Sequence, residues 1–294
     1  ASIFPMDGED PDALIKNADI AMYRAKEDGR NNFQLFNSEM HARGYGRLTL
    51  ESSLRRAVEK NEFLIHYQPE IDLASGEFTG TEALIRWQHP QRGLIYPKEF
   101  IGVSEESGLI IPIGEWVLKE ACVQNQKWQT MFSRGLTASV NISPAQIRSK
   151  GFVDRIIKIL EETGMDPKYL SLELTENIFM DPSAVIMDAI DKLRKLKIRF
   201  AIDDFGSGYC SLGYLKSFAV DTLKIDQSFI RSMTTDSDYA SIVLSVIELA
   251  HRLKLKVTAE GVETEDQHQF LLKHMCDRAQ GFLFSTPLPE DELT

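Results

Sequence analysis

The feature that most constrains the fold of this chain is a repeated alternation of short apolar segments with amphipathic helical segments. Alternating apolar residues predict strands, and apolar residues three and four positions apart predict helices. The eight predicted strands span Phe63–Gln68, Thr79–Trp87, Thr137–Ile142, Leu170–Leu174, Arg199–Ile202, Thr222–Ile225, Lys256–Ala259 and Arg278–Phe282. Most of them are separated by predicted helices, at Ile113–Met131, Gly151–Thr163, Pro182–Leu196, Asp238–Leu253 and Thr264–His274. This order is typical of a parallel sheet covered by helices, and eight strands in about 230 residues favour a closed (β/α)8 barrel.

A doubly wound open sheet is the alternative fold. When such a sheet binds a dinucleotide, a Gly-x-Gly-x-x-Gly sequence follows its first strand. This chain has no such sequence in that position, and its absence favours the barrel.

The N-terminal segment does not follow the repeat. Asp10 as an N-cap and Pro11 at the first helical position predict the start of a helix. A short strand is predicted at Phe33–Phe36, and the polar stretch Met40–Arg47 predicts a hinge before a helix at about Leu48–Asn61. We therefore divide the chain into a helix–strand segment at 1–37, a linker at 38–50 and a barrel at 51–294. Because the first segment cannot bury both its faces alone, we expect the chain to be part of a longer protein.

Composition limits the partners of the chain. Its 33 Lys and Arg residues against 44 Asp and Glu residues give a net charge of −11, which repels a polyphosphate backbone, so we expect no polymeric nucleic acid partner. No apolar run approaches the roughly 18–20 residues of a spanning helix, so we expect no membrane contact from this chain. Cys122, Cys210 and Cys276 are widely spaced, and no signal-like segment precedes them. We expect reduced thiols and a cytoplasmic location, even if a longer parent protein is anchored in a membrane.

Acidic residues gather where the predicted strands end. In a barrel, these ends converge on the face that holds the active site. The polar residues placed there are Glu82, Asn141, Glu173, Asp203, Asp204, Lys224 and Glu260. Several ionised carboxylates in one pocket require cations, and oxygen ligands suit Mg²⁺ or Mn²⁺ better than zinc. The adjacent aspartates indicate two metals, which together activate water and bind a phosphodiester, while a lysine adds positive charge.

Each of these residues also has an ordinary structural explanation. Glu82 alone could form a salt bridge at a strand end, and Lys224 could pair with Asp226. Asn141 could cap the next helix, although Ser143 before Pro144 is the better candidate. The convergence of so many acids on strand ends favours a shared metal site, because independent surface salt bridges would not produce it.

The sequence Glu82-Ala83-Leu84 with Arg86-Trp87 resembles the signature of the EAL-domain cyclic-di-GMP phosphodiesterases. The resemblance extends over roughly Leu50 to Leu288 and includes Tyr67-Gln68-Pro69, Asn141-Ile142-Ser143, Glu173-Leu174-Thr175-Glu176, Asp203-Asp204-Phe205-Gly206-Ser207-Gly208-Tyr209, Lys224-Ile225-Asp226, Glu260-Gly261-Val262-Glu263 and Gln280-Gly281-Phe282. It implies a (β/α)8-type barrel with one antiparallel strand. It also implies hydrolysis of one phosphodiester bond of cyclic di-GMP to give linear pGpG.

The resemblance also implies roles for individual residues. Two Mg²⁺ or Mn²⁺ ions would be held by Glu82, Asn141, Glu173, Asp203 and Asp204, with Asp203 shared between them. Lys224 would position the nucleophilic water, and Glu260 would act as the general base or also ligate metal. The residues that contact substrate or order the site would be Gln68, Leu84, Arg86, Asp226 and Gln280, with Glu176 and Glu263 in support. The loop Asp204–Leu212, in which Cys210 replaces a common serine, would link the metal site to a homodimer interface.

The segment from Asn17 to Lys26, followed by Gly29-Arg30-Asn31, resembles the C-terminal end of a GGDEF diguanylate cyclase domain. The GGDEF signature itself is absent from this chain. The resemblance therefore implies a GGDEF–EAL tandem parent and excludes cyclase activity for this chain.

Two other functions compete with hydrolysis of cyclic di-GMP. The first is a receptor that binds this nucleotide without cleaving it, and such receptors usually lack some metal ligands. The second is a glycosidase with two carboxylates, which would work without metal but would explain neither Asn141 nor the Asp203–Asp204 pair. Because every acid that the chemistry needs is present in its motif, the enzyme is favoured.

Overall fold

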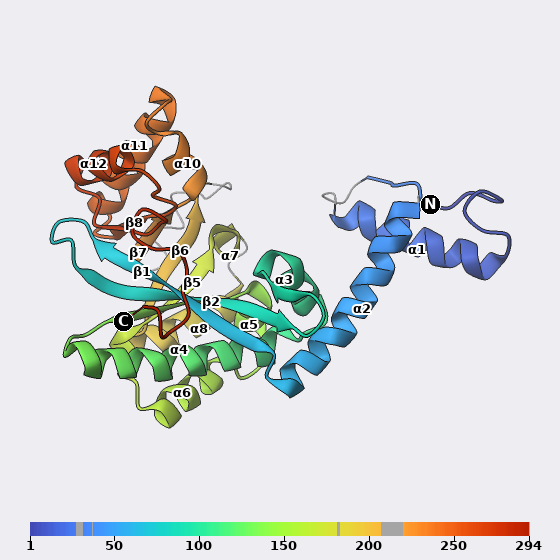
Figure 1. Ribbon diagram of the computed structural model, residues 1–294, viewed down its shortest axis with the longest axis horizontal. Helices are drawn as coiled ribbons and strands as arrows, with labels where there is room; N and C mark the ends of the chain where they lie inside the picture. The colour runs from blue at the N-terminus through green and yellow to red at the C-terminus, as the bar shows by residue number, and fades with distance from the viewer. Residues whose placement is uncertain (28–31, 37, 181–182, 207–219, 294) are drawn as a thin grey trace.

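The computed structural model of the protein describes residues 1–27, 32–36, 38–180, 183–206 and 220–293. Within these residues, eight strands close a barrel, and the helices lie around it (Figure 1). The barrel strands are β1 (Phe63–Asp72), β2 (Phe78–His89), β4 (Thr137–Asn141), β5 (Leu170–Thr175), β6 (Arg199–Phe205), β7 (Thr222–Ile225), β8 (Lys256–Ala259) and β9 (Arg278–Ala279). The predicted barrel is confirmed, because an open sheet would leave β1 without one of its two neighbours, β2 and β9.

Strand direction gives the barrel a defined rim. β1 is antiparallel to both β2 and β9, whereas the other neighbouring barrel strands are parallel. The single antiparallel barrel strand agrees with the expectation from the family resemblance. The parallel strands from β2 to β9 therefore all end on one face. A further strand that was not predicted, β3 (Gly93–Ile95), pairs antiparallel with the end of β2.

The described helices of the barrel cover its outer face. They are α3 (Pro97–Glu106), α4 (Ile110–Phe132), α5 (Pro144–Arg148), α6 (Phe152–Thr163), α7 (Glu176–Met180), α8 (Ala184–Lys195), α10 (Gln227–Ser232), α11 (Ser237–Arg252) and α12 (Glu265–Lys273), with a 3₁₀ turn at Pro167–Tyr169. Their apolar faces bury large side chains such as Trp128, while Phe200 fills the sheet side of the core. Ser143 caps α5 and forms a capping box with Gln146, so the predicted cap is confirmed.

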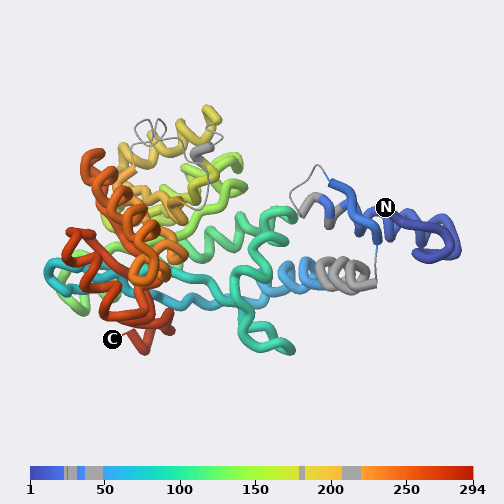
Figure 2. The backbone as a smooth tube through the Cα atoms, turned by 90° about the horizontal axis from the view of Figure 1, so that it is seen from above, coloured from blue at the N-terminus to red at the C-terminus, as the bar shows by residue number. Residues whose placement is uncertain are grey.

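The N-terminal helices project from the barrel, as the view from above shows (Figure 2). α1 (Pro11–Glu27) begins as predicted, because Asp10 Oδ1 accepts a hydrogen bond of 2.7 Å from the Ala13 amide. The predicted strand at Phe33–Phe36 is wrong. The described part of the chain gives these residues no strand ladder, and they bond instead to the N-terminus, with Phe36 N donating to Ala1 O at 2.8 Å.

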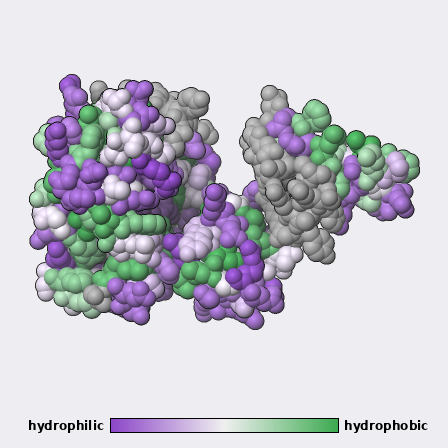
Figure 3. Space-filling view, turned by 45° about the horizontal axis from the view of Figure 1, so that its top comes forward, coloured by the Kyte–Doolittle hydropathy of each residue, from purple (hydrophilic) through white to green (hydrophobic). Residues whose placement is uncertain are grey.

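The predicted hinge at Met40–Arg47 is also wrong. A single helix, α2 (Ser38–Lys60), runs through it. Each of its two internal glycines costs only about 1 kcal/mol in a helix, which the remaining hydrogen bonds of a long helix outweigh. No helix in the described ranges combines the length and the apolar character that a membrane span requires. Phe4, Met6 and Phe33 of the N-terminal segment are exposed. Figure 3 shows hydrophobic surface on the part of the chain that projects from the barrel.

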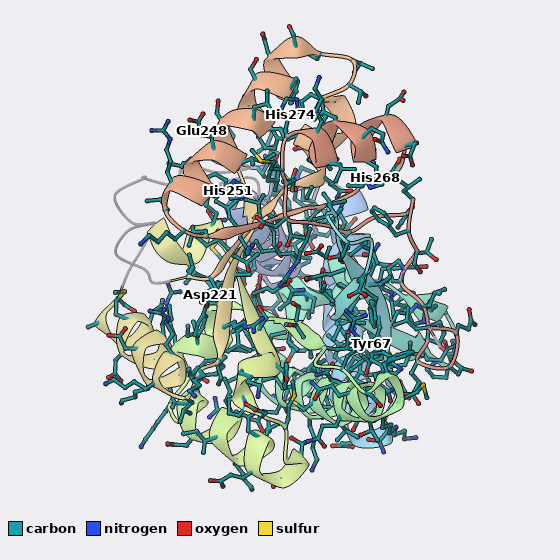
Figure 4. All side chains as sticks on the ribbon, turned by 90° about the vertical axis from the view of Figure 1, so that its left-hand side faces the viewer. Tyr67, Asp221, Glu248, His251, His268 and His274 are labelled. Atoms are coloured by element: carbon teal, nitrogen blue, oxygen red, sulfur yellow. The ribbon has the colours of Figure 1, made fainter. Side chains whose placement is uncertain are left out.

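Asp277 joins several segments by hydrogen bonds at the end of the barrel opposite the rim. Its carboxylate accepts hydrogen bonds from Val257 N at 2.9 Å and from Lys256 Nζ at 2.5 Å, and it lies 2.9 Å from His251 Nε2. Figure 4 shows His251 on the same side of the barrel as Asp221, whose Oδ2 accepts a bond from Phe200 N. Burial acts to raise the pKa of Asp277, but its hydrogen bonds outweigh burial and hold the pKa below its ordinary value of 3.8.

We expect Asp277→Asn to lower the free energy of unfolding by about 2 kcal/mol at neutral pH, because charge-assisted hydrogen bonds are lost. Since the native pKa of Asp277 is depressed, its stabilisation is present above the ordinary value of 3.8 and disappears as the pH falls through the native value. Urea unfolding of both proteins across this range measures the difference. The matched control is Asp188→Asn, which removes an exposed pair with Lys192 and should change little. A difference between wild type and Asp277→Asn that does not shrink in acid would contradict this account.

Candidate active site

A buried lysine forms the centre of the rim. The side chain of Lys224, on β7, is only 1% exposed. Its Nζ lies 2.6 Å from Glu260 Oε1, 2.7 Å from Glu173 Oε2, 3.0 Å from Glu82 Oε2 and 3.4 Å from Asp203 Oδ1. These carboxylates come from β2, β5 and β6 and from the residue after β8, so five segments of the chain meet at one ammonium group.

Strand register brings these side chains together. In the parallel ladder, Asn141 lies opposite Glu173 and Thr175 lies opposite Asp203. Residues in register on neighbouring strands project from the same face, so the predicted metal ligands share one rim. Asn141 Nδ2 donates a hydrogen bond of 2.7 Å to Glu82 Oε1, so Asn141 orients a carboxylate at this rim.

Gln280 holds the other carboxylate oxygen of Glu82 and is itself bonded to Gln68. Gln280 Nε2 donates to Glu82 Oε2 at 2.8 Å and to Gln68 Oε1 at 2.9 Å. Gln68 lies opposite Glu82 in the antiparallel β1–β2 pair, and its own Nε2 donates to Ser285 O at 3.1 Å. Glu82 is therefore fixed by donors from three segments of the chain, namely Asn141, Lys224 and Gln280.

The two adjacent aspartates lie at an irregularity of β6. The ladder between β6 and β7 shifts between Ile202 and Phe205, and Asp204 has a φ of 52°, in the left-handed region. Such a bulge re-aims a side chain that would otherwise alternate to the opposite face. As a result, one carboxylate oxygen from each of Asp203, Asp204 and Glu260 lies within 4.8 Å of the others.

Charge in this pocket is unbalanced. Burial raises the pKa values of Glu173 and Glu260 well above the ordinary range, although Lys224 opposes this. Burial also favours a raised pKa for Glu82, but Lys224 and hydrogen bonds reverse the direction. The pKa of Asp204 rises to about 6 because of burial and the neighbouring Asp203 and Asp226. One ammonium group does not neutralise this many carboxylates, so the pocket favours additional cations.

The donor set fits a hard metal ion. It contains carboxylate oxygens and one amide, and within the described residues Asp203 Oδ1 is buried without a hydrogen-bond partner. Unpartnered buried oxygen atoms next to other carboxylates are suitable ligands for hard divalent ions such as Mg²⁺. The acidic cluster is therefore a possible metal-binding site.

The other predicted substrate residues lie around this cluster. Leu84 is half-buried between Glu82 and Arg86 in the alternation of β2. Arg86 is buried, and its guanidinium donates to Ile85 O at 2.9 Å. Asp226 lies outside β7, caps α10 through the Ser228 amide, and makes no described pair with Lys224.

The two predicted supporting residues have different surroundings. Glu176 is buried, and its Oε2 accepts a hydrogen bond of 2.9 Å from Gly206 N, directly after the two aspartates. Glu263 is exposed and lies 3.6 Å from Arg231 NH2, with no described contact to the Lys224 cluster. In the loop predicted to reach a dimer interface, positions 207–212, including Cys210, lie outside the described residues.

The sequence analysis did not identify a second buried charged group below the rim. Glu70 is 3% exposed, its Oε2 lies 3.3 Å from Arg278 NH1, and its Oε1 accepts from Ser139 Oγ at 3.3 Å. Its negative charge contributes to the raised pKa of Glu173. Its position two residues after Gln68 on one strand could have indicated this placement, because such residues share a face.

Comparison with known proteins identifies the family. Residues 51–287 match the EAL domain family. The chain belongs to this family. It is 41% identical over 292 residues to the bifunctional diguanylate cyclase/cyclic di-GMP phosphodiesterase MucR of Pseudomonas aeruginosa, covering 99% of this chain and 43% of that protein. It is 39% identical over 288 residues to the cyclic di-GMP phosphodiesterase PdeR of Escherichia coli, covering 98% and 43%.

A solved structure is similar over the whole EAL domain. The PaMucR phosphodiesterase in complex with c-di-GMP superimposes with a TM-score of 0.80 at 41% identity, covering 84% of this chain and 100% of that one. By contrast, this chain spans less than half the length of the curated relatives named above.

We expect Lys224→Met to destabilise the protein in EDTA by about 3 kcal/mol, because removing one partner leaves buried carboxylates without their cation. Added Mg²⁺ should stabilise this variant more than wild type, since a metal would then supply the missing positive charge. Urea unfolding with and without Mg²⁺ tests both effects. Lys119→Met, which removes an exposed pair with Glu162, is the matched control. If Lys224→Met is as stable as wild type in EDTA, the lysine does not stabilise the cluster.

Proposed function

We propose that this EAL domain is a phosphodiesterase that hydrolyses cyclic di-GMP to linear pGpG and uses two Mg²⁺ or Mn²⁺ ions. The observation that carries the proposal is the convergence of Glu82, Glu173, Asp203 and Glu260 on Lys224, with Asp204 beside them. The similarity to MucR and PdeR, both named as cyclic di-GMP phosphodiesterases, supports the same substrate.

In this proposal, Glu82, Asn141, Glu173, Asp203 and Asp204 hold the metals, which would lower the pKa of water and offset negative charge on the phosphodiester. Asp203 would be the shared ligand, as the family resemblance implies; its Oδ1 accepts no hydrogen bond within the described residues and lies 3.4 Å from Lys224 Nζ. Amide donors from Asn141 and Gln280 fix the orientation of Glu82 before substrate arrives.

Glu260 and Lys224 act on the proton and on the developing charge. Glu260 follows β8 at the rim and is 17% exposed, so its carboxylate combines contact with Lys224 and access to the pocket. It accepts the proton of the attacking water as a general base. Lys224 Nζ, 2.6 Å from Glu260, positions that water and stabilises the charge that develops on phosphorus-bound oxygens.

The substrate is bound by side chains around the cluster. Gln68, Arg86, Asp226 and Gln280 supply donors and acceptors, and Leu84 supplies an apolar contact. Glu176 supports the turn after the aspartates through Gly206, and Glu263 supports the loop after β8 from the surface.

Three further features belong to this proposal. Residues 1–37 are the end of a GGDEF domain in a longer protein, as the length and name of MucR suggest. The domain forms a homodimer through the Asp204–Leu212 region. The protein works in the cytoplasm, in keeping with its unpaired buried thiols Cys122 and Cys276.

We expect linear pGpG to form when cyclic di-GMP is incubated with the protein and Mg²⁺, and no product to form in EDTA, because the carboxylates alone supply no positive charge for the phosphodiester. Chromatography of the products, together with an equilibrium-binding assay, makes the measurement. Tight binding without product in Mg²⁺ or Mn²⁺ would contradict the proposal and establish a receptor instead. Hydrolysis that persists in EDTA would contradict the role of metal.

The role of Glu82 as a metal ligand and the role of Glu260 as the general base can be separated by substitution. Glu82→Ala should lose metal binding and nearly all activity, because a ligand is removed. Glu260→Ala should bind cyclic di-GMP but turn it over about 10²–10⁴-fold more slowly, because the general base is removed. Metal titration, nucleotide titration and steady-state kinetics distinguish them, with Glu115→Ala on the outer surface as a control. Equal activity in wild type and both variants would refute the assigned roles.

A further inference from the structure

The pairing of β2 with β3 places an aromatic residue at the rim of the site. The register of this short ladder is Trp87 with Ile95, Gln88 with Leu94 and His89 with Gly93. The next pair in the same register is Arg86 with Tyr96. Opposite residues in an antiparallel pair project from the same face, and Arg86 shares its face of β2 with Glu82. Tyr96 therefore lies on the face of β2 that points toward the acidic cluster.

The side chains of this pair are in contact. Arg86 Cζ lies 5.1 Å from the centroid of the Tyr96 ring, within the range of a cation–π interaction. Arg86 is 6% exposed, whereas Tyr96 is 54% exposed. One nitrogen of the guanidinium donates to Ile85 O, and Nε is buried without a partner in the described part of the chain. The ring thus covers one side of a guanidinium that retains donor capacity.

The backbone around Tyr96 is well suited to hold the ring in place. Tyr96 is the N-cap residue of α3, with extended φ and ψ angles of −91° and 155°, and Pro97 follows at the first helical position. Proline restricts the preceding residue to this region, so the ring is attached to a backbone with little freedom. The Tyr96 side chain makes no capping hydrogen bond to α3. Its interaction in the described part of the chain is the contact of its ring with Arg86.

We propose that Tyr96 is a positioning residue that holds the Arg86 guanidinium ready to bind two acceptor atoms of cyclic di-GMP; this inference rests on the proposed function. A guanidinium fork matches two phosphate oxygens, and it equally matches O6 and N7 of guanine. Without the ring, Arg86 loses an attractive contact and gains rotamer freedom that substrate binding must remove. The ring makes the contact, so phenylalanine can replace tyrosine.

We expect Tyr96→Leu to raise KM for cyclic di-GMP about fivefold while kcat stays within about twofold, because a cation–π contact of this kind is worth a factor of this size. Tyr96→Phe should resemble wild type. In the Glu260→Ala background, where turnover is slow, calorimetry should show the same fivefold rise in Kd for Tyr96→Leu. Thermal unfolding checks that the variants are folded, as expected for a side chain that is 54% exposed.

Tyr169→Leu is the matched control. Tyr169 also has a cation over its ring, with Lys168 Nζ 4.8 Å from the centroid, but it lies directly before β5, at the end of the barrel opposite the rim. The KM and Kd of the Tyr169→Leu variant for cyclic di-GMP should equal those of wild type.

Several results would overturn the inference. One is an unchanged Kd and KM in Tyr96→Leu, another is a loss confined to kcat, and a third is a Tyr96→Phe variant as weak as Tyr96→Leu. Cyclic di-AMP, with the same phosphates but no guanine O6, separates the two acceptor sources. If Tyr96→Leu weakens the binding of cyclic di-GMP alone, Arg86 binds the guanine edge. If it weakens the binding of both nucleotides equally, Arg86 binds the phosphates. A wild-type protein that neither binds nor cleaves cyclic di-GMP would instead overturn the proposed function.

Discussion

The geometry of the site depends on one buried ammonium group and the carboxylates around it. Lys224 makes ion pairs of 2.6 to 3.4 Å with Glu82, Glu173, Asp203 and Glu260, so the positions of four carboxylates are coupled through one group. Four carboxylates at one cation leave negative charge uncompensated in a poorly solvated space. The same arrangement that orders the rim therefore also creates its affinity for further cations.

Closure of the barrel makes this arrangement possible. β1 enters antiparallel between β2 and β9, and this places Gln68 directly opposite Glu82. Gln280, after β9, then bridges both side chains through one amide nitrogen. Side-chain amide hydrogen bonds thus connect β1, β2 and the residue after β9, where the barrel closes. The orientation of Glu82, a proposed metal ligand, therefore depends on the strand pairing that closes the barrel.

Much of this arrangement was predictable from the sequence because strand alternation and strand ends are local properties. The barrel and its main strands followed from apolar spacing, and parallel register placed the acids on one rim. β3 was missed because three residues carry too little periodicity, and the continuous α2 was missed because helix length outweighed the glycines at its start. The left-handed Asp204 and the Glu70–Arg278 pair depend on bulge geometry and on contacts between distant segments, which local patterns do not specify.

The site divides into two groups of residues with different mechanical support. The proposed metal ligands and Lys224 lie in barrel strands, and all of them except Asp204, which lies at the irregularity of β6, are paired with at least one neighbouring strand. Residues proposed to bind substrate or to position such a residue include two at helix starts: Asp226, which caps α10, and Tyr96, which precedes α3 and contacts Arg86. Such positions tolerate substitution without disturbing the ladder. A change at Tyr96 can therefore alter the affinity for a nucleotide while the acidic cluster, and the chemistry it supports, stays intact, whereas Asp226 also influences the pKa of Asp204.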